Sequence, residues 1–297
     1  MPQPQGPKNH TTEVEKAHVN AVQKIVNKVK DFHRRQVPFR IYHGTTCTTR
    51  RLHLERDKII DTSEMVNVIS INSERMTALV EPNVSMDKLV QKALSLKLMP
   101  SVVMEFPGIT VGGGFAGTGA ETSSFRYGLF EQTIIRIDIV LANGELVHAS
   151  KSEREDLFYG SGSSFGTTGV ITLLEIQLVK ASKYVRMDYI SVYSASEAIK
   201  TMSEAMRDDS VNYIESFLYS PKKAVVYLGH LCNERPPGYR LQKFTRAHDP
   251  WFYLHARHII KDLAHNTNGG KASDVIPLKD YLFRHNRGAF WGGEYAY

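Results

Sequence analysis

Glycine dominates one short stretch of the chain, PGITVGGGFAGTGAETSSFRYG from Pro107 to Gly128. Glycine weakens regular secondary structure, so this density indicates that bare main chain comes close to another surface. We expect a non-helical loop whose N–H groups wrap a pyrophosphate without help from a helix dipole. The alternative interpretation is a glycine-rich bend packed against another part of the protein.

Two further small-residue segments favour the ligand interpretation. HGTTCTT spans residues 43–49, and GSGSSFGTTGVI spans residues 160–171. Three separated loops of this kind suit a large anionic cofactor that lies between subdomains.

The common nucleotide motifs fit the glycine segment poorly. Gly112, Gly114 and Gly117 satisfy G-x-G-x-x-G, but the residues that follow lack helical periodicity. Asp138, at the distance expected for a ribose-binding carboxylate, falls inside a predicted strand instead of at its end. No Gly-Lys-Ser/Thr follows, which also excludes a P-loop.

Several other chemistries find no support. His255, His258 and Asp262 share one predicted helical face, but no H-E-x-x-H accompanies them, so we predict no metal site. Neither a G-x-S-x-G elbow nor a catalytic cysteine signature is present. The net charge of +6 is too diffuse to indicate a nucleic-acid partner.

The composition is that of a folded protein with a sizeable core. The chain has 297 residues, of which 42% are hydrophobic. Cys47 and Cys232 are too few and too far apart for a disulfide framework, which favours a reducing compartment. No run of about 18 apolar residues occurs, so we expect a soluble, cytoplasmic protein with at most peripheral membrane contact.

Periodicity predicts an α+β organisation. Residues 12–36 read as an amphipathic helix with a basic outer face, which packs on its own domain rather than on a membrane. Residues 68–82 read as two strands around a polar turn at Asn72–Arg75, and residues 100–106 as one strand. Residues 133–150 read as a hairpin with a type I′ turn at Asn143-Gly144. From Met187 onward a β-α-β-β succession has a ferredoxin-like order. We predict domains at 1–37, 38–182 and 183–297.

Several segments of the sequence together resemble a known family. TVGGGFAGTGAETSSFRYG, VLANGELVHAS, DLFYGSGSSFGTTGVITLLEIQLVKASKYV and VEPNVSMDKLV together are similar to FAD-binding domains of the PCMH, or vanillyl-alcohol-oxidase, type. Within that type the likeness is closest to delta(24)-sterol reductases, over Phe39 to Val185 and more weakly through YLFRHNRGAFW. The resemblance implies a two-subdomain FAD-binding domain followed by a partial ferredoxin-like substrate domain.

The resemblance assigns cofactor contacts to all three small-residue segments. The implied FAD-binding residues are Thr45, Thr46, Cys47 and Thr48; Thr110, Val111, Gly112, Gly113, Gly114, Ala116 and Ala120; and Gly169, Val170 and Ile171. Many relatives attach FAD covalently through a histidine, and Cys47 stands at the matching position. We therefore predict non-covalent FAD.

The implied reaction is the NADPH-dependent reduction of a sterol side-chain double bond. A hydride from flavin N5 and a proton from an acid would complete it. Glu105 is the candidate acid, because cytokinin-oxidising relatives carry an acidic residue five positions before the threonine that matches Thr110. A salt-bridged carboxylate is the equally weighted alternative. Arg126 and Tyr127 rank second, as flavin-contacting or packing residues.

Two other functions remain open at this level. The first is an FAD oxidase or dehydrogenase of an alcohol, sugar or lactone, and the second is a truncated flavin-binding remnant without activity. The sterol reductases extend beyond residue 297 and carry an N-terminal membrane anchor, so the chain is expected to be a fragment with peripheral contact at the endoplasmic reticulum. The partner expected is a small apolar substrate such as a sterol, and the oligomeric state is not determined by the sequence.

Overall fold

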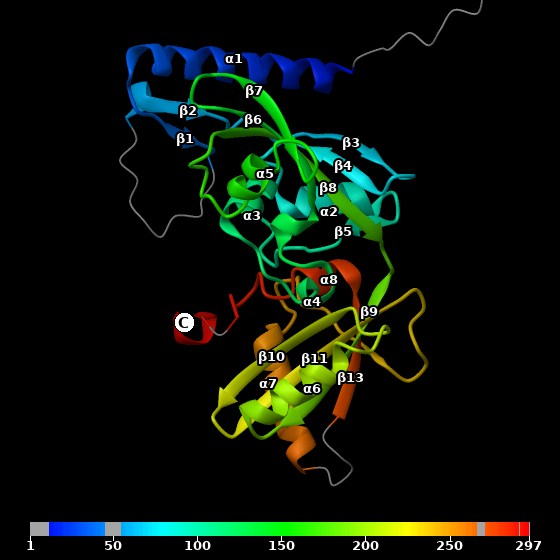
Figure 1. The fold of residues 1–297 in the computed structure, drawn as a ribbon. Helices are drawn as coiled ribbons and strands as arrows, with labels where there is room; N and C mark the ends of the chain where they lie inside the picture. Colours follow the sequence, from blue (N-terminus) through cyan, green and yellow to red (C-terminus); the bar gives the residue numbers. More distant parts are fainter. Residues whose placement is uncertain (1–11, 45–54, 266–270, 291, 297) are drawn as a thin grey trace, which may run out of the picture. The chain divides into compact units, whose positions relative to one another are not determined.

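The computed structural model describes residues 12–44, 55–265, 271–290 and 292–296. The chain divides into two compact units, which it enters alternately (Figure 1). Unit one comprises Met1–Ser85, Thr110–Gly117 and Ile134–Ile176, and unit two comprises Met86–Ile109, Thr118–Thr133 and Gln177–Tyr297. Helices and strands are mixed in both units, which confirms the predicted α+β class. The domain boundaries at residues 37 and 182 stay a prediction.

Unit one is built on a mainly antiparallel sheet. Its strands lie in the order β3 (Val68–Asn72), β4 (Thr77–Val80), β8 (Val170–Lys180), β6 (Ile134–Val140) and β7 (Leu146–Ser150). A short parallel pair, β1 (Arg40–Tyr42) and β2 (Ile59–Asp61), stands apart from this sheet, and η1 (Arg56–Lys58) precedes β2. The strand pairs predicted within residues 68–82 and 133–150 are confirmed.

The turn between β6 and β7 differs in type from the prediction. Gly144 has a positive φ of +81°, but Asn143 does not have a positive φ, whereas a type I′ turn requires a positive φ at both of its central residues. The N–H of Gly144 donates to the carbonyl of Leu141 over 2.8 Å, and the N–H of Leu141 donates to that of Glu145 over 2.9 Å. This pattern is the three-residue hairpin in which glycine takes the single left-handed position.

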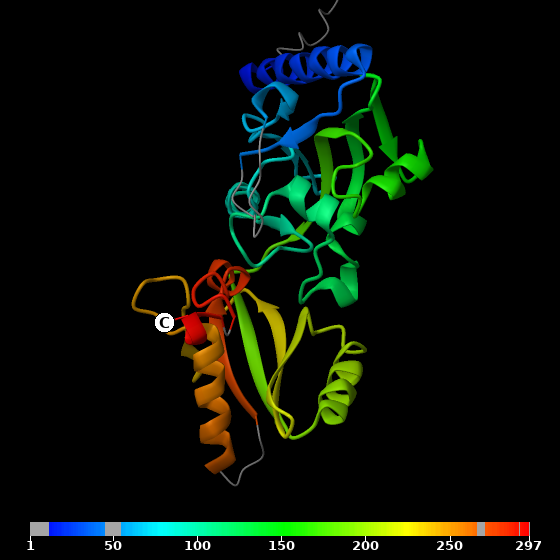
Figure 2. The ribbon, with the colours of Figure 1, turned by 90° about the vertical axis from the view of Figure 1, so that its left-hand side faces the viewer.

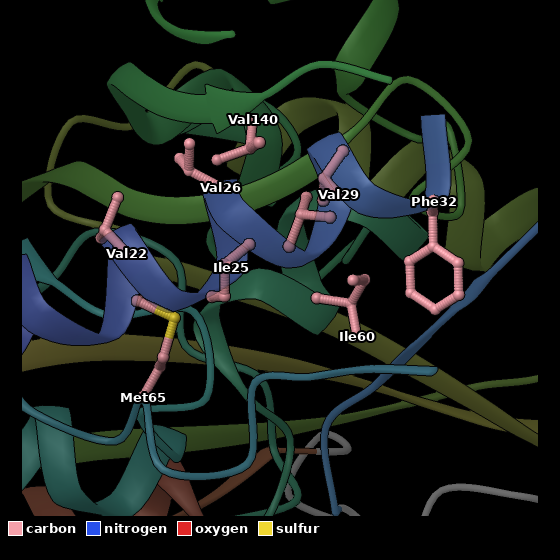
Figure 3. Close-up of a cluster of buried hydrophobic side chains, with 9 residues drawn as sticks. Val22, Ile25, Val26, Val29, Phe32, Ile60, Met65 and Val140 are labelled. Carbon is pink, nitrogen blue, oxygen red and sulfur yellow. The ribbon is translucent and has the colours of Figure 1, made fainter. Parts of the chain in front are cut away.

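Helix α1 (Glu13–Arg35) confirms the predicted amphipathic helix and its packing within the protein. Thr12 accepts from the N–H of Glu15, whose carboxylate accepts from the N–H of Thr12 in return, a capping box that fixes the start. The buried face comprises Val22, Ile25, Val26, Val29 and Phe32, which pack with Ile60, Met65, Val140 and Val170 (Figure 3). This cluster holds β2 and the adjoining ends of β6 and β8 together.

The segment after α2 (Met86–Leu94) departs from the sequence prediction. Strand β5 covers only Leu98–Pro100, pairing with the last residues of β8, and residues 101–106 are irregular. The predicted strand at 100–106 is wrong because β4 and β6 already occupy both edges of the earlier part of β8. Glu105 therefore lies in an irregular segment and not at a strand end.

Unit two contains a second sheet, in the order β10-β11-β9-β13-β12. Its strands are β9 (Tyr184–Val192), β10 (Tyr213–Ser220), β11 (Lys223–Cys232), β12 (Arg240–Leu241) and β13 (Lys271–Pro277). The predicted β-α-β-β succession is present as β9, α6 (Ala195–Ala205), β10 and β11. Helix α7 (Phe252–His265) and β13 then supply a second β-α-β connection.

The two long helices of unit two cover opposite faces of this sheet (Figures 1 and 2). Alternation along the strands explains why, since Val226 packs in the α6 cluster while the neighbouring Tyr227 contacts Phe252 of α7. The remaining helical segments of the unit are α4 (Ser124–Tyr127), η2 (Phe130–Thr133), α8 (Leu278–Leu282) and α9 (Gly292–Ala296). No described helix combines the length and apolar character that crossing a bilayer requires.

Candidate functional site

A cavity of about 660 Å³ opens in unit one beside β1. It is lined by residues 39–44, Ala142 and residues 165–169. Residues of the small-residue segments 43–49 and 160–171 therefore line one cavity, and its volume is that of a typical small-molecule or cofactor site. Thr45, Thr46, Cys47 and Thr48, which the sequence assigns to the same site, lie outside the described residues.

The wall formed by β1 is held by a side chain that the sequence does not assign to the site. Asn83 is buried, and its Nδ2 donates to the carbonyl of Thr62 over 2.5 Å. Thr62 in turn donates to the carbonyl of Tyr42 through its N–H at 2.8 Å and its hydroxyl at 3.1 Å. Asn83 lies in VEPNVSMDKLV, one of the stretches that carry the family resemblance, as a polar residue between a buried strand and a helix.

The wall formed by residues 165–169 presents an unusual aromatic side chain. Phe165 has φ +53° and is 83% exposed, although it lines the cavity. A bulky residue at positive φ is an outlier that persists only where its surroundings hold it. Here the N–H of Phe165 donates to the carbonyl of Ala116 over 2.9 Å, and that of Ser163 donates to Phe115 over 3.0 Å.

The glycine segment itself is helical, which corrects the predicted loop. Helix α3 covers Val111–Gly117. Each of its first four N–H groups donates within the protein: Val111 to the Val84 carbonyl at 2.9 Å, Gly112 to the Pro82 carbonyl at 2.7 Å, Gly113 to Thr110 Oγ1 at 3.1 Å and Gly114 to the Thr110 carbonyl at 2.8 Å. These donors are therefore not free for a phosphate, and the nest interpretation is wrong for them.

The glycines of α3 serve different purposes. A Cβ on Gly112 would lie 2.8 Å from Pro82 Cβ, so the packing interpretation holds at that position. Gly113 and Gly117 are exposed, and a Cβ on Gly117 would meet nothing within 4 Å. The surface open to a ligand is thus confined to part of the segment.

The other assigned cofactor residues also divide into buried and accessible ones. Val111 and Val170 are fully buried, so their side chains support neighbouring main chain instead of reaching a ligand. Gly169 packs against β6, since a Cβ there would lie 2.6 Å from the carbonyl oxygen of Val140. Ala116 and Ile171 are half-buried, Ala120 is exposed, and Gly114 and Thr110 are buried. Cofactor contact by these residues stays a prediction.

Glu105 belongs to a buried charged cluster within unit two. Its Oε1 lies 2.5 Å from Nη2 of Arg284, and the same nitrogen donates to Oε2 of Glu215 at 2.8 Å. Arg284 follows α8 and Glu215 lies on β10, so three distant parts of the chain converge. Glu105 therefore lies against a cation, as the salt-bridge interpretation expects, and its role as a catalytic acid stays a prediction.

The carboxyl groups of this cluster have divergent pKa values. Burial raises the pKa of Glu105 to about 7, against the opposing charge of Arg284 and with the support of nearby Glu215. Burial likewise raises the pKa of Glu121 to about 7. Burial would also raise the pKa of Glu215, but Arg284 and His285 outweigh it and lower that pKa to about 2. The cluster thus retains dissociable protons near neutral pH.

His285 completes the cluster. Its Nε2 lies 3.2 Å from Oε1 of Glu215, and its ring stacks on Phe290 with centroids 4.1 Å apart. Ligand atoms of Glu105, Glu215 and His285 lie within 4.8 Å of one another, a spacing that suits a metal ion. However, the guanidinium of Arg284 already contacts both carboxylates, so the positive charge that they need is supplied by the protein.

Arg126 and Tyr127 lie on α4, apart from that cluster in their contacts. The guanidinium of Arg126 donates to the carbonyl of Val211 over 2.8 Å and lies 3.7 Å from the carboxylate of Asp209. Tyr127 is 37% exposed. These contacts describe packing on a neighbouring loop, and a catalytic role for either residue stays a prediction.

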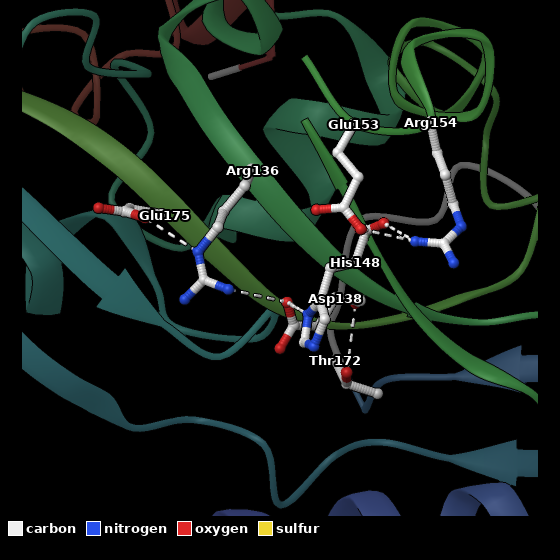
Figure 4. A network of polar contacts seen from close by, with 7 residues as sticks. All are labelled: Arg136, Asp138, His148, Glu153, Arg154, Thr172 and Glu175. Carbon is white, nitrogen blue, oxygen red and sulfur yellow. Dashed lines mark hydrogen bonds and ion pairs between the residues drawn. The ribbon is translucent and has the colours of Figure 1, made fainter. Parts of the chain in front are cut away.

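Asp138 and His255 each have a charged partner close by. Asp138 contacts His148 at 2.6 Å and Arg136 at 3.4 Å across the β6–β7 face (Figure 4). It therefore serves a cross-strand network and is not presented to a ribose. His255 contacts Asp274 over 2.6 Å, which commits it to the core of unit two.

The sequence comparisons indicate a flavin-binding domain in the first half of the chain. Residues 14–150 match the model of the FAD binding domain family. The chain carries an FAD-binding domain. This domain includes β1, Ala142 and the polypeptide around them, whereas residues 165–169 complete the cavity from beyond the matched range.

Relatives of the FAD-binding chain include two sterol reductases and one dehydrogenase. Delta(24)-sterol reductase of Pisum sativum is 31% identical over 305 residues, covering 94% of this chain and 52% of the relative. The Homo sapiens delta(24)-sterol reductase is 33% identical over 229 residues, covering 76% and 43%. Cytokinin dehydrogenase 3 of Arabidopsis thaliana is 29% identical over 132 residues, covering 43% and 25%. The chain spans about half the length, or less, of these relatives.

Proposed function

We propose that this chain is the FAD-binding part of an NADPH-dependent reductase that saturates a carbon–carbon double bond of a sterol. The observation that carries the proposal is the cavity of about 660 Å³ inside a chain whose residues 14–150 are an FAD-binding domain. Similarity to delta(24)-sterol reductases over 94% of the chain supports the sterol substrate. The enzyme would contact membranes peripherally, at the endoplasmic reticulum.

The residues around the cavity fit a large anionic cofactor. Arg40 is exposed at its wall and offers a cation, and Thr167 and Thr168 offer hydroxyl groups. Phe165 offers an aromatic face on which a flavin or adenine ring would stack. We propose that these residues hold FAD without a covalent bond, together with the exposed main chain of Gly113 and Gly117.

Saturating an isolated double bond requires a hydride at one carbon and a proton at the other, and bound FAD, once reduced by NADPH, supplies the hydride. Glu105 is the proposed proton donor, because it is buried and its pKa is raised to about 7. Proton loss to the substrate leaves the carboxylate beside Arg284, which stabilises that charge. A proton from solvent then restores the acid.

The test is spectroscopic. The purified protein should be yellow, and acid should release intact FAD from it. Anaerobic NADPH should bleach the flavin absorbance, and a sterol with a side-chain double bond should restore it. Glu105→Gln should still be bleached by NADPH but lose reoxidation by the sterol, about 10²–10⁴-fold in rate. Colourless protein that takes up no FAD would refute the proposal.

A second candidate is an FAD-dependent dehydrogenase or oxidase of an alcohol, sugar or lactone, favoured by the match to cytokinin dehydrogenase 3. Here Glu105 would accept a proton rather than donate one. Bleaching of the flavin by a polyol or lactone, and oxygen consumption afterwards, would support it. Flavin binding without either reaction would point to an inactive remnant.

A further inference from the structure

The two carboxylates that share Arg284 are not equivalent. Both contact the same nitrogen, Nη2, Glu105 at 2.5 Å and Glu215 at 2.8 Å. His285 breaks the symmetry, because its Nε2 lies 3.2 Å from Glu215 but 3.7 Å from Glu105. Glu215 therefore has two close nitrogen partners, whereas Glu105 has one.

Counting the charges shows why this difference matters. Three carboxyl groups, Glu105, Glu121 and Glu215, face one guanidinium and the imidazole of His285, and all three are largely removed from solvent. If every carboxyl were ionised, three negative charges would face at most two positive ones, even with His285 protonated, and burial makes that excess costly. One or more of the three must hold a proton, and Glu215 is the best neutralised of them.

We propose that Glu215 is a positioning residue: by serving as the permanent anionic partner of Arg284 and His285, it leaves Glu105 as the group that carries the dissociable proton, with Glu121 as a second holder of it. The proposal rests on the proposed function only for what this proton is used for. Its content, the division of charge among the carboxyls, is a property of unit two itself.

The surroundings of the cluster support this division. The guanidinium of Arg284 lies over the ring of Tyr281 at 4.3 Å and over that of Phe252 at 5.2 Å, so rings cover faces that water would otherwise solvate. Glu121 accepts a hydrogen bond from the main-chain N–H of Glu105, which brings the second carboxyl beside the first. A cavity of about 10 Å³ beside Glu105 and Arg284 is at the lower limit for one water molecule.

The experiment measures the proton directly and needs neither cofactor nor substrate. Carboxyl carbons of glutamate are labelled with ¹³C, and each resonance is followed through a pH titration of the whole chain. Glu105→Gln identifies the Glu105 signal by its loss. In Glu215→Gln, Arg284 has one anionic partner left, so the midpoint of Glu105 should fall by at least one pH unit, a tenfold change in proton affinity.

Matched variants separate this effect from a general disturbance. Glu204→Gln alters an exposed glutamate on α6 of the same unit and should leave the Glu105 midpoint unchanged. Glu121→Gln should lower the midpoint, because it removes the second proton holder and its repulsion. If Glu215→Gln does not fold, Glu215→Asp withdraws the carboxylate from Arg284 and should lower the midpoint less strongly.

The outcomes discriminate clearly. An unchanged or raised Glu105 midpoint in the Glu215 variant would overturn the proposal, as would a wild-type Glu215 that titrates above Glu105. A sterol reductase assay that fails while the Glu105 midpoint falls as expected would reject the proposed function and leave this inference standing. Normal reductase activity with an unmoved midpoint would do the reverse.

Discussion

Gly112 lies so close to Pro82 that a side chain at position 112 would overlap Pro82. Its N–H donates to the Pro82 carbonyl over 2.7 Å, and a Cβ would lie 2.9 Å from that oxygen. The contact joins the start of α3 to the loop that follows β4, the loop that also carries Asn83. The β1 wall of the cavity in unit one is therefore tied to the glycine segment through main-chain packing.

Replacing Gly112 with alanine should destabilise unit one. The added methyl group overlaps Pro82 main chain and ring, and overpacking of this kind costs about 1–3 kcal/mol. Hydrogen exchange of peptides that cover residues 110–117 measures this local effect. Exchange there should accelerate in the variant.

Gly117→Ala is the matched control. A Cβ at this position meets nothing within 4 Å, so stability should stay within about 1 kcal/mol of the unmodified chain. Affinity for FAD should nevertheless fall if the cofactor lies against this surface. Equal exchange rates in the Gly112 and Gly117 variants would contradict the packing argument.

The parts of the fold that the sequence predicts are those determined locally. Helix α1 has apolar residues at helical spacing and a capping box, and both act within a few residues. Helix α3 was not predictable in this way, since glycine disfavours a helix and the segment is held by acceptors on Val84, Pro82 and Thr110. Tertiary contacts there outweigh the intrinsic preference.

The candidate site divides in the same manner. Glu105 stands out in the sequence because of its apolar neighbours, and the small residues near the cavity stand out by composition. Arg284 lies in YLFRHNRGAFW, which carries the weaker part of the resemblance, but neither its role nor that of Glu215 shows locally, because the role depends on the tertiary packing that brings residues 105, 215 and 284 together. The partners that set the charge of Glu105 therefore become visible only in the folded chain.

The free energy of unfolding should pass through a maximum at mildly acidic pH. Folding raises the pKa of Glu105 and Glu121 from 4.5 to about 7, so between these values the folded state binds more protons and stability falls as pH rises. Folding lowers the pKa of Glu215 from 4.5 to about 2, so its contribution is lost as pH falls through that range. The loss toward pH 7 should be roughly 3 kcal/mol for each of these two groups.

Urea unfolding across this pH range measures the effect. Other groups also titrate here, so the informative quantity is the difference between the unmodified chain and Glu105→Gln. The variant cannot ionise at this position and should lose less stability between pH 4.5 and 7. Parallel profiles for the two proteins would show that Glu105 does not hold a proton in the folded state.

Phe165→Ala should weaken FAD binding without affecting the fold. The side chain is 83% exposed at the cavity, so few protein contacts are lost. Stacking of a base or flavin ring on an aromatic side chain is worth about 1–3 kcal/mol, which predicts a Kd raised by about 5- to 150-fold. Quenching of flavin fluorescence measures this Kd. Tyr159→Ala, at an exposed aromatic outside the cavity lining, should leave it unchanged.

Arg284→Met should destabilise unit two in a strongly pH-dependent way. The substitution keeps much of the side-chain volume but leaves Glu105 and Glu215 without their shared cation, and breaking such a buried pair costs about 3–5 kcal/mol. At about pH 5 the carboxyls can take up protons, which relieves this cost. At about pH 8 protonation of the carboxyls is unfavourable because the proton concentration in solution is low. Thermal unfolding followed by circular dichroism should therefore show a larger loss at the higher pH. The control is Arg240→Met, at an exposed arginine on β12, which should change the thermal stability little at either pH. If Arg284→Met instead lost the same stability at both pH values, the contribution of Arg284 would be packing and not charge.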